Sequence, residues 1–272
     1  MRVPFIKMHG LGNDFLVLDA RDRPLPDLGP GIVRRLSDRH TGIGFDQLIR
    51  VARAGPGSGA DIVMTIHNAD GSASGACGNA ARAVARLHGA PALCETAGGL
   101  IRLEPVGGGA SVDMGEPRFA WDAIPLAYTM DTAALPLAWD ELAGPACVNV
   151  GNPHAVFFVG DCDAVPLETL GPVIENDPVF PERVNVNVAT IEARDRIRLR
   201  VWERGTGLTR ACGTGACATA VAAVRGGLVD TKVTVVLPGG TLDIAWSEGR
   251  SIIMTGPASE AYRGDFALED YA

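Results

Sequence analysis

Two short segments, CGNAARAVARLHG (Cys77–Gly89) and CGTGACATAVAAVRGG (Cys212–Gly227), decide how this 272-residue chain folds. Each begins with a cysteine, continues with alanine-rich sequence and ends on glycine, the residue that most often follows the last turn of a helix. They predict helices over 78–88 and 213–225, each starting directly after a cysteine. A third helix is predicted over 30–40.

Short alternating apolar stretches surround these segments and predict β-strands. They are separated by Gly, Pro, Asn and Asp, the residues that favour turns. The predicted strands are Ile62–Ile66, Leu100–Leu103, Ala155–Val159, Ile197–Trp202, Lys232–Leu237 and Thr241–Ala245. The segment 114–144, with its Pro, Ala and Trp residues, is expected to connect two halves of the chain. The pattern is that of a mixed α/β (α+β) protein.

The two halves repeat the same landmarks in the same order. A Gly-Asn pair, Gly12–Asn13 in one half and Gly151–Asn152 in the other, precedes the cysteine by 64 and 60 residues, counted from each asparagine. Closer in, Asn68 and Glu203 each follow a predicted strand and stand nine residues before the cysteine. Because such a repeat changes the whole prediction of the fold, we expect two similar lobes that each carry one cysteine at the start of a helix.

Composition and charge narrow the classes of function. The chain has 24 Lys and Arg against 32 Asp and Glu, a formal net charge of −8, which argues against a surface that wraps nucleic acid. No apolar run approaches the roughly 20 residues that span a bilayer, and no secretory signal is visible. The six cysteines are not spaced as metal-binding pairs. We expect a cytoplasmic protein with a small-molecule partner and without nucleic-acid, membrane or metal sites.

A thiol in the first turn of a helix lies at the positive end of the helix dipole, which favours the thiolate and is expected to lower the thiol pKa. Two such thiols on opposite sides of an α carbon could invert it, one removing a proton and the other returning one. The alternative is that both cysteines are merely buried residues, an interpretation that the duplicated context disfavours. The other four are expected to be structural: Cys94, Cys147, Cys162 and Cys217.

Several longer motifs carry a resemblance to a known family. They are MHGLGNDF (Met8–Phe15), TGIGFDQL (Thr41–Leu48), HNADGS (His67–Ser72), CGNAAR (Cys77–Arg82), GNPH (Gly151–His154), ERVN (Glu182–Asn185) and ERGTGLTRACGTGA (Glu203–Ala216). Together they resemble diaminopimelate epimerase, in order, from near the N-terminus to about residue 227. The sequence departs from the family at Ala80, where glycine is usual.

The resemblance implies a fold and an activity. The implied fold is two pseudo-symmetric lobes, each a mostly antiparallel sheet curled around a central helix, with the active site in the cleft between them. We place the lobes at 1–117, to which 263–272 return, and at 118–262. The implied activity is the interconversion of LL- and meso-2,6-diaminopimelate in lysine biosynthesis, without a cofactor, by an enzyme that forms a homodimer.

The resemblance also implies roles for individual residues. Cys77 and Cys212 are the implied acid and base, with Cys212 accepting the proton and Cys77 donating one in the LL to meso direction. His154 and Glu203 are implied to support catalysis. The implied substrate contacts are Asn13, Gln47, Asn68, Gly78, Asn79, Asn152, Asn185, Glu203, Arg204, Gly213 and Thr214.

These roles fit the chemistry of the side chains, although each has a simpler alternative. A guanidinium such as that of Arg204 binds carboxylate through a planar fork, and Asn amides both donate and accept hydrogen bonds. Equally, Glu203 and Arg204 could be a surface ion pair, the Gly-Asn pairs could be turns, and His154 could be a structural histidine.

Four other functions compete with this interpretation. A proline or hydroxyproline racemase would also use two cysteines, but would not need the groups that hold a second amino-acid head. The pattern Gly213-x-Gly215-x-x-Ala218 formally matches a dinucleotide fingerprint, yet it follows a polar segment instead of a buried strand. A thiol hydrolase with His154 would leave the repeat unexplained. A non-catalytic binding protein is the last class, and exchange of a substrate proton with solvent would exclude it.

Overall fold

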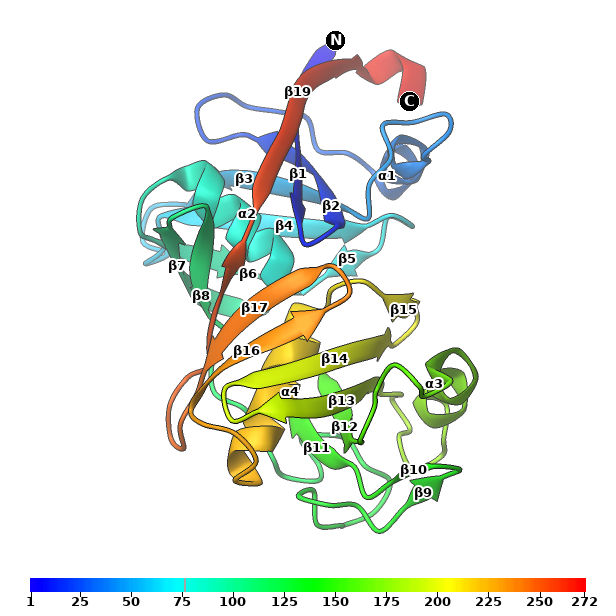
Figure 1. The fold of residues 1–272 in the computed structure, drawn as a ribbon. Helices are drawn as coiled ribbons and strands as arrows, with labels where there is room; N and C mark the ends of the chain where they lie inside the picture. The colour runs from blue at the N-terminus through cyan, green and yellow to red at the C-terminus, as the bar shows by residue number, and fades with distance from the viewer. Residues whose placement is uncertain (76) are drawn as a thin grey trace. The chain divides into compact units, whose positions relative to one another are not determined.

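A computed structural model describes residues 1–75 and 77–272, which divide into two compact units. Unit 1 comprises Met1–Val112 and Gly256–Ala272, and unit 2 comprises Asp113–Thr255. Each unit is built from a twisted, mostly antiparallel sheet and two α-helices (Figure 1). The predicted mixed α/β class is confirmed.

Unit 1 starts and ends on neighbouring strands. Its strands are β1 (Arg2–Gly10), β2 (Asn13–Asp19), β3 (Gln47–Arg53), β4 (Ile62–Asn68), β5 (Ala73–Ser74), β6 (Ala92–Thr96), β7 (Gly99–Val106), β8 (Gly109–Asp113) and β19 (Ser259–Ala267). Its helices are α1 (Pro30–Ser37), α2 (Gly78–His88) and the short 3-10 helix η1 (Leu268–Tyr271). β2–β3 and β4–β6 are parallel pairs, whereas the other pairs along this sheet, including β1–β19, are antiparallel.

Unit 2 follows the same plan. Its strands are β9 (Ala138–Trp139), β10 (Leu142–Ala143), β11 (Ala146–Asn149), β12 (Pro153–Phe158), β13 (Asn185–Ala193), β14 (Arg196–Glu203), β15 (Gly207–Thr209), β16 (Lys232–Leu237), β17 (Gly240–Ala245) and β18 (Ile253–Pro257). Its helices are α3 (Leu167–Glu175) and α4 (Gly213–Arg225). β12–β13 and β14–β16 are parallel, and the neighbouring pairs along the sheet are antiparallel.

The internal repeat predicted from the sequence is confirmed by this topology. From β1 to β8 and from β11 to β18, strands and helices follow one another in the same order, and the parallel pairs fall at the same places. α2 and α4 occupy equivalent positions. α2 lies between β5 and β6 in the sequence, and β6 pairs in parallel with β4; α4 lies between β15 and β16, and β16 pairs in parallel with β14. The two cysteines that precede these helices are therefore structural counterparts.

Both cysteine-led helices have the bounds that the sequence predicts. Cys77 and Cys212 stand immediately before α2 and α4 in extended conformation. Beyond the other ends, Gly89 (φ 78°) and Gly227 (φ 68°) supply the left-handed residue that lets the chain leave the helix. The six predicted strands are also present, as β4, β7, β12, β14, β16 and β17, with small differences at their ends.

The helix predicted over 30–40 is shorter than expected and ends at Ser37. The carboxylate of Asp38 accepts hydrogen bonds from the backbone N–H groups of His40 (2.8 Å) and Thr41 (2.7 Å), which turns the chain away from the helix axis. Hydrogen bonds of this kind between a side chain and the backbone compete with continuation of the helix, and here they end it at Ser37.

Helix α3 was not among the predicted elements. It contains Gly171 and Pro172, two poor helix formers, so its local sequence does not favour a helix. The helix is stabilised by tertiary packing, because its buried residues Leu167, Leu170 and Ile174 face β13 and β14.

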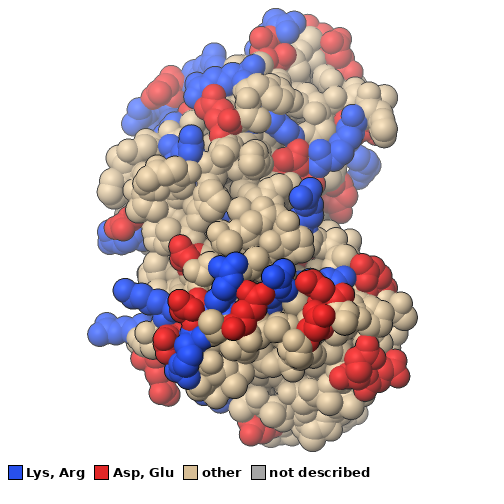
Figure 2. Space-filling model, in the orientation of Figure 1, with Lys and Arg blue, Asp and Glu red and all other residues tan. Residues whose placement is uncertain are grey.

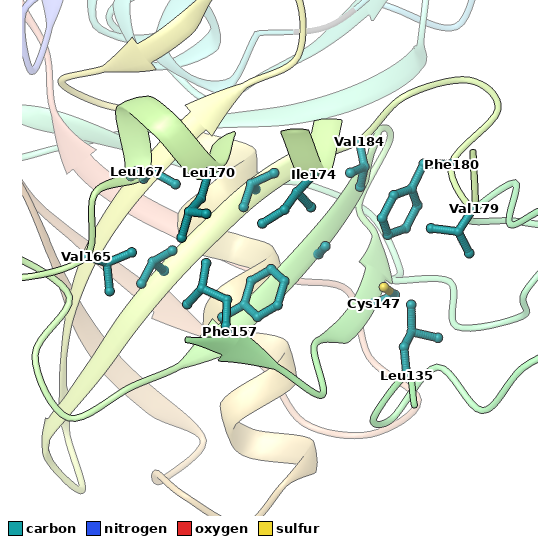
Figure 3. Close-up of a cluster of buried hydrophobic side chains, with 14 of the residues drawn as sticks. Leu135, Cys147, Phe157, Val165, Leu167, Leu170, Ile174, Val179, Phe180 and Val184 are labelled. Carbon is teal, nitrogen blue, oxygen red and sulfur yellow. The ribbon is translucent and has the colours of Figure 1, made fainter. Parts of the chain in front are cut away.

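Each unit has a core of its own. In unit 2 the cluster of Figure 3 joins α3 to the sheet, with Phe157 near its middle and Phe180 beside Val179 toward one end. The alanine-rich helix α4 contacts β11, β12, β13, β14, β16 and β17, so the sheet surrounds it. Small side chains allow this close approach of helix and strands. In unit 1, α1 packs on a separate cluster that includes Phe5, Leu16 and Phe45.

The charged side chains do not gather into one basic region on the face drawn in Figure 2, where Lys and Arg alternate with Asp and Glu. Ion pairs such as Arg194–Asp230 and Arg53–Asp22 account for part of this mixing. Within the described ranges, no helix has the length and apolar character needed to traverse a bilayer.

Candidate active site

The first predicted catalytic cysteine, Cys77, lies at the start of α2 in unit 1. Its Sγ accepts a hydrogen bond from the backbone N–H of Ala80 (3.4 Å). The thiol donates in turn to Oδ1 of Asn13, 3.8 Å away at the start of β2. Cys77 is partly exposed, in contrast to the five other cysteines, which are buried.

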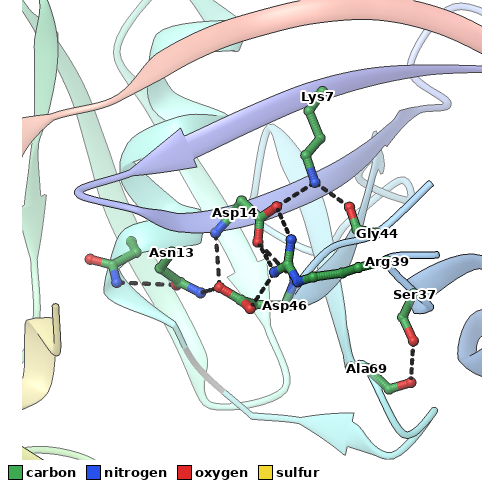
Figure 4. A network of polar contacts seen from close by, with 9 residues as sticks. Lys7, Asn13, Asp14, Ser37, Arg39, Gly44, Asp46 and Ala69 are labelled. Carbon is green, nitrogen blue, oxygen red and sulfur yellow. Dashed lines mark hydrogen bonds and ion pairs between the residues drawn. The ribbon is translucent and has the colours of Figure 1, made fainter. Parts of the chain in front are cut away.

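The amide of Asn13 is held at both ends. Its Nδ2 donates to Oδ2 of Asp46 (2.9 Å), and its Oδ1 accepts from Nδ2 of Asn79 (3.1 Å). Asn79 is fixed by the fully buried Arg82, whose Nη2 donates to Oδ1 of Asn79 (2.7 Å). These contacts turn the carbonyl oxygen of Asn13 toward Cys77 and the start of α2 (Figure 4).

A compact group of four charges supports Asn13 from the opposite side (Figure 4). Nζ of Lys7 lies 2.5 Å from Asp14, while Nη2 of Arg39 bridges Asp14 (2.7 Å) and Asp46 (2.8 Å). Burial alone would raise the pKa of Asp14, but the hydrogen bonds from Arg39 and Lys7 lower that pKa to about 2. Asp14 is therefore ionised near neutral pH.

We expect Asp14→Asn to lower the free energy of unfolding by about 2 kcal/mol or more near neutral pH, since each pKa unit is worth about 1.4 kcal/mol. The pKa of Asp14 is lower in the folded state than its ordinary value of 3.8. Its contribution is thus complete above that value and is lost as the pH falls toward 2. Urea unfolding of both proteins at about pH 7, 5 and 3 measures the difference.

The exposed pair Arg53–Asp22 provides the control, because Asp22→Asn should change the stability by less than about 1 kcal/mol. A stability difference for Asp14→Asn that stays the same from neutral pH down to about pH 3 would contradict the role given to Asp14.

Two predicted substrate contacts lie side by side on β3 and β4. Gln47 pairs with Asn68 across the strands, and Nε2 of Gln47 donates to Oδ1 of Asn68 (3.1 Å). Asn68 donates to Oγ of Ser72 (3.1 Å). Among residues 1–75 and 77–272, no partner is found for the buried Oε1 of Gln47. This oxygen can accept a hydrogen bond from a ligand ammonium.

The second predicted catalytic cysteine, Cys212, precedes α4 and is almost fully buried. Its Sγ accepts a hydrogen bond from the backbone N–H of Gly215 (3.3 Å) and lies 3.4 Å from Oγ1 of Thr214. A methyl group at Gly215 would stand 3.0 Å from Val201 and 3.2 Å from Sγ of Cys212, so these side chains would have to shift by a few tenths of an ångström to accept it. Its counterpart in unit 1, Ala80, tolerates the extra carbon.

Burial raises the pKa of the Cys212 thiol well above its ordinary value, and the negative charge of Glu203 raises that pKa further. Hydrogen bonds from Thr214 and from the backbone of Gly215 act in the opposite direction but are weaker. The expectation of a lowered thiol pKa at the helix start is wrong for Cys212. Desolvation raises the pKa by more than the hydrogen bonds and the dipole at the helix start lower it. Glu203 is held in place by the hydroxyl of Thr209, which donates to its carboxylate.

Asn185 is the first residue of β13, and Arg204 lies in the turn between β14 and β15. Oδ1 of Asn185 accepts from the backbone N–H of Arg204 (3.0 Å), and its Nδ2 donates to the carbonyl of Pro153 (2.8 Å). The guanidinium of Arg204 donates to the carbonyl of Glu182 (2.8 Å). Asn185 thus shapes the backbone on which Glu203 and Arg204 stand.

His154 lies fully buried in β12, with Nδ1 3.1 Å from Oδ1 of Asn187 and Nε2 2.9 Å from Oδ1 of Asn152. Burial lowers the pKa of His154 to about 4, the charge of Arg204 adds to this, and the hydrogen bond with Asn187 opposes it. The imidazole is therefore neutral near neutral pH.

The remaining predicted contacts stand at the two helix starts. Gly78 and Gly213 are the first residues of α2 and α4 and are buried, and Asn79 and Thr214 follow them. Unpaired backbone N–H groups at a helix start favour a carboxylate ligand. The predicted site residues of unit 1 are Asn13, Gln47, Asn68, Cys77, Gly78 and Asn79, and those of unit 2 are Asn152, His154, Asn185, Glu203, Arg204, Cys212, Gly213 and Thr214.

The two sets correspond residue by residue. In unit 1, Gln47 of β3 pairs with Asn68 of β4. In unit 2 the counterpart of this strand pair is β13–β14, where Val186 pairs with Trp202, so the next residues along the two strands, Asn185 and Glu203, lie opposite each other. In the repeat, neutral Asn68 of unit 1 is therefore the counterpart of acidic Glu203 of unit 2. The environments of the two thiols differ in charge.

Sequence reasoning missed several residues that position the site. They are Lys7, Asp14, Arg39, Asp46, Arg82, Glu175 and Asn187. Glu175 is buried, and its carboxylate accepts from Nε1 of Trp202 (2.7 Å) and from the backbone of Gly205 (2.8 Å). The signal that could reveal such residues is a polar side chain within an otherwise apolar element, because buried polar groups need specific partners.

In the part of the chain that the structure describes, no group of three His, Cys, Asp or Glu side chains is arranged to hold a metal ion. Cys94, Cys147, Cys162 and Cys217 are all buried, as expected for structural residues. The geometry is that of two thiols, each with hydrogen-bonding and carboxylate-binding groups around it.

Comparison with known proteins decides the family. A family model described as diaminopimelate epimerase matches residues 5–120 and 146–260. Diaminopimelate epimerase of Erythrobacter litoralis is 61% identical over 272 residues, which covers 100% of both chains. The chain belongs to the diaminopimelate epimerase family. As a member of this family it is an isomerase, and the resemblance deduced from the motifs is confirmed.

Further comparisons agree with membership of the diaminopimelate epimerase family. Diaminopimelate epimerase of Rhizorhabdus wittichii is 57% identical over 271 residues, covering 100% of this chain and 98% of that one. The crystal structure of a hydroxyproline epimerase from Agrobacterium vitis shares the fold, with a TM-score of 0.67 over 99% of this chain and 93% of that one. Its sequence is 16% identical to this chain, so the similarity shows the fold alone.

Proposed function

We propose that the protein interconverts LL- and meso-2,6-diaminopimelate, inverting one α carbon with two cysteine side chains in lysine biosynthesis. The observation that carries this proposal is the duplicated helix start: Cys77 and Cys212 occupy equivalent positions in two units of the same topology. Two thiols in matching settings suit a reaction that needs one proton acceptor and one proton donor.

In the LL to meso direction Cys212 accepts the proton and Cys77 donates one. The thiolate of Cys212 takes the proton as the Cα–H bond breaks, and the electron pair remains on the α carbon and its carboxylate. The S–H of Cys77 then gives its proton to the opposite face. Because burial raises the pKa of Cys212, its thiol needs a neighbouring base, and Glu203 fills that role.

The α-carboxylate binds to the backbone N–H groups at the helix starts, where negative charge developing on it is stabilised. Polar side chains bind the second, unreacting amino-acid head. The free Oε1 of Gln47 accepts from its ammonium, and Arg204 binds its carboxylate. This second set of contacts is what distinguishes diaminopimelate from proline.

We further propose that the reaction needs no pyridoxal or metal cofactor, that the two units act as the two lobes of the enzyme, and that it works in the cytoplasm as a homodimer. The spectrum of the purified, active protein should show no absorption beyond that of its aromatic residues. Light scattering coupled to gel filtration tests the dimer.

A stereochemical assay tests the proposed function directly. Purified protein is incubated with LL-diaminopimelate, L-proline and trans-4-hydroxy-L-proline in separate reactions, and the stereoisomers are resolved by chiral chromatography. We expect meso-diaminopimelate to form and both prolines to remain unchanged. Inversion of either proline with no reaction of diaminopimelate would replace the proposal with a proline racemase, and no inversion of any substrate would indicate a binding protein.

A further inference from the structure

Asn187 belongs to none of the predicted contacts, yet it is fully buried beside the site in unit 2. It lies on β13, and its amide reaches α4 on one side and His154 on the other. Nδ2 of Asn187 is 3.0 Å from the carbonyl oxygen of Gly215 and 3.0 Å from Oγ1 of Thr219. Its Oδ1 is 3.1 Å from Nδ1 of His154.

These contacts permit only one orientation of the Asn187 amide. A backbone carbonyl can only accept a hydrogen bond, so the amide nitrogen must face Gly215. The amide oxygen then faces His154, and it too can only accept. Nδ1 of His154 must therefore carry the hydrogen atom.

This assignment fixes the second nitrogen of the imidazole. His154 is completely buried, and a buried imidazole is neutral unless a charge partner stabilises the cation. A neutral ring with hydrogen on Nδ1 has only a lone pair on Nε2. Nε2 must accept a hydrogen bond, but the Asn152 atom placed 2.9 Å from it is Oδ1, which cannot donate one.

The amide of Asn152 is thereby oriented as well. An amide oxygen against the Nε2 lone pair would be repelled, so the NH₂ end of Asn152 must turn to Nε2 and the carbonyl oxygen must turn away. Amide oxygen and nitrogen are assigned from such hydrogen-bond networks, since the two atoms are otherwise hard to distinguish.

The repeat supports the same orientation independently. Asn13, the counterpart of Asn152 in unit 1, donates its amide nitrogen to Asp46 and turns its carbonyl oxygen toward Cys77. Unit 2 reaches the equivalent arrangement with an imidazole lone pair in place of a carboxylate. Both units then present an asparagine carbonyl oxygen, an acceptor suited to a substrate ammonium.

We infer that Asn187 is a positioning residue that holds His154 as the neutral tautomer protonated on Nδ1, so that Asn152 directs its carbonyl oxygen at the substrate. The inference rests on the proposed function only for the identity of the ligand that Asn152 meets. The chain of contacts runs from the backbone of α4 through Asn187 and His154 to Asn152.

Nitrogen NMR of the ¹⁵N-histidine-labelled full-length protein tests the tautomer without reference to activity. We expect His154 to show a protonated Nδ1 and an unprotonated Nε2, unchanged from neutral pH down to about pH 5, since its pKa is about 4. A ring protonated on Nε2, or on both nitrogens, near neutral pH would overturn the inference even if the protein proves to be an active epimerase.

Asn187→Asp tests the positioning role. A carboxylate facing Nδ1 stabilises the imidazolium, so we expect the pKa of His154 to rise by about one unit or more. We also expect kcat/KM to fall about tenfold on the acidic side of the pH profile, because a protonated Nε2 would turn the Asn152 amide around. Circular dichroism verifies that the variant is folded.

Thr219→Val is the matched control, because it removes the other contact of the Asn187 amide nitrogen but leaves Gly215 and Nδ1 in place. It should keep the tautomer and the pKa of His154. A purely structural role for Asn187 would lower the melting temperature in both variants without moving the pH profile, and that result would contradict the inference. An inactive wild-type protein with the expected tautomer would instead refute the proposed function alone.

Discussion

Replacing either Cys77 or Cys212 by alanine is expected to lower kcat for the epimerisation of diaminopimelate by at least about 10³-fold. Each thiol serves one face of the α carbon, so loss of one leaves no route for the complete inversion. Because the two cysteines stand in equivalent positions before α2 and α4, the two variants should be impaired to a similar extent. Folding should be largely retained.

The measurement is the rate of meso-diaminopimelate formation by each variant, with circular dichroism as the test of folding. Cys217→Ala supplies the matched control, since this residue is fully buried within α4 and is not at its start. We expect it to cost about 1 kcal/mol of stability through a small cavity and to preserve turnover. Near-normal activity of Cys77→Ala or Cys212→Ala would eliminate the scheme with two bases.

Glu203→Gln should have the second-largest effect, a loss of about 10²-fold in kcat. The Cys212 thiol has a pKa well above its ordinary value, first because it is buried and second because of Glu203. A carboxylate can take the thiol proton, whereas the amide of glutamine has the same shape and cannot. Loss of the negative charge would by itself lower the thiol pKa, so a fall in kcat identifies Glu203 as the proton acceptor. The loss should therefore appear in kcat, with a smaller change in KM.

Thr209→Val provides a graded comparison for this prediction, since its hydroxyl donates to the Glu203 carboxylate. Removing that hydrogen bond leaves the carboxylate chemically intact, so we expect a loss of roughly tenfold or less. If Glu203→Gln turned over as fast as the wild type, Glu203 would be reduced to a residue that shapes the β14–β15 turn.

The fold could be predicted from the sequence wherever local pattern and tertiary structure agree. α2 and α4 have the predicted bounds because alanine, glycine caps and burial all favour the same helix. α3 was not predicted because Gly171 and Pro172 oppose a helix that packing against β13, β14 and β15 stabilises. The premature end of α1 at Ser37 depends on side-chain capping by Asp38, a contact that periodicity does not encode.

The same distinction applies to the candidate site. The two cysteines and Asn13, Asn68 and Asn152 could be singled out from spacing and repetition, whereas Asn79 and Asn185 were implied only by the resemblance to the family. Several of the residues that orient them could not, because Asp46 and Asn187 act through contacts with residues far apart from them in the sequence. The pKa of Cys212 was predicted in the wrong direction, since the degree of burial of a residue at a helix start cannot be read from the helix alone.

The central claim is that Cys212 and Cys77 exchange protons with opposite faces of one α carbon, and deuterium labelling in heavy water tests it most directly. LL-diaminopimelate is converted to a small extent, and the deuterium content of product and recovered substrate is measured by mass spectrometry. We expect meso product that carries one deuterium from the donor thiol, with almost none in the remaining LL substrate. Product that retains the original proton, or equal labelling of substrate and product from the first turnovers, would contradict it.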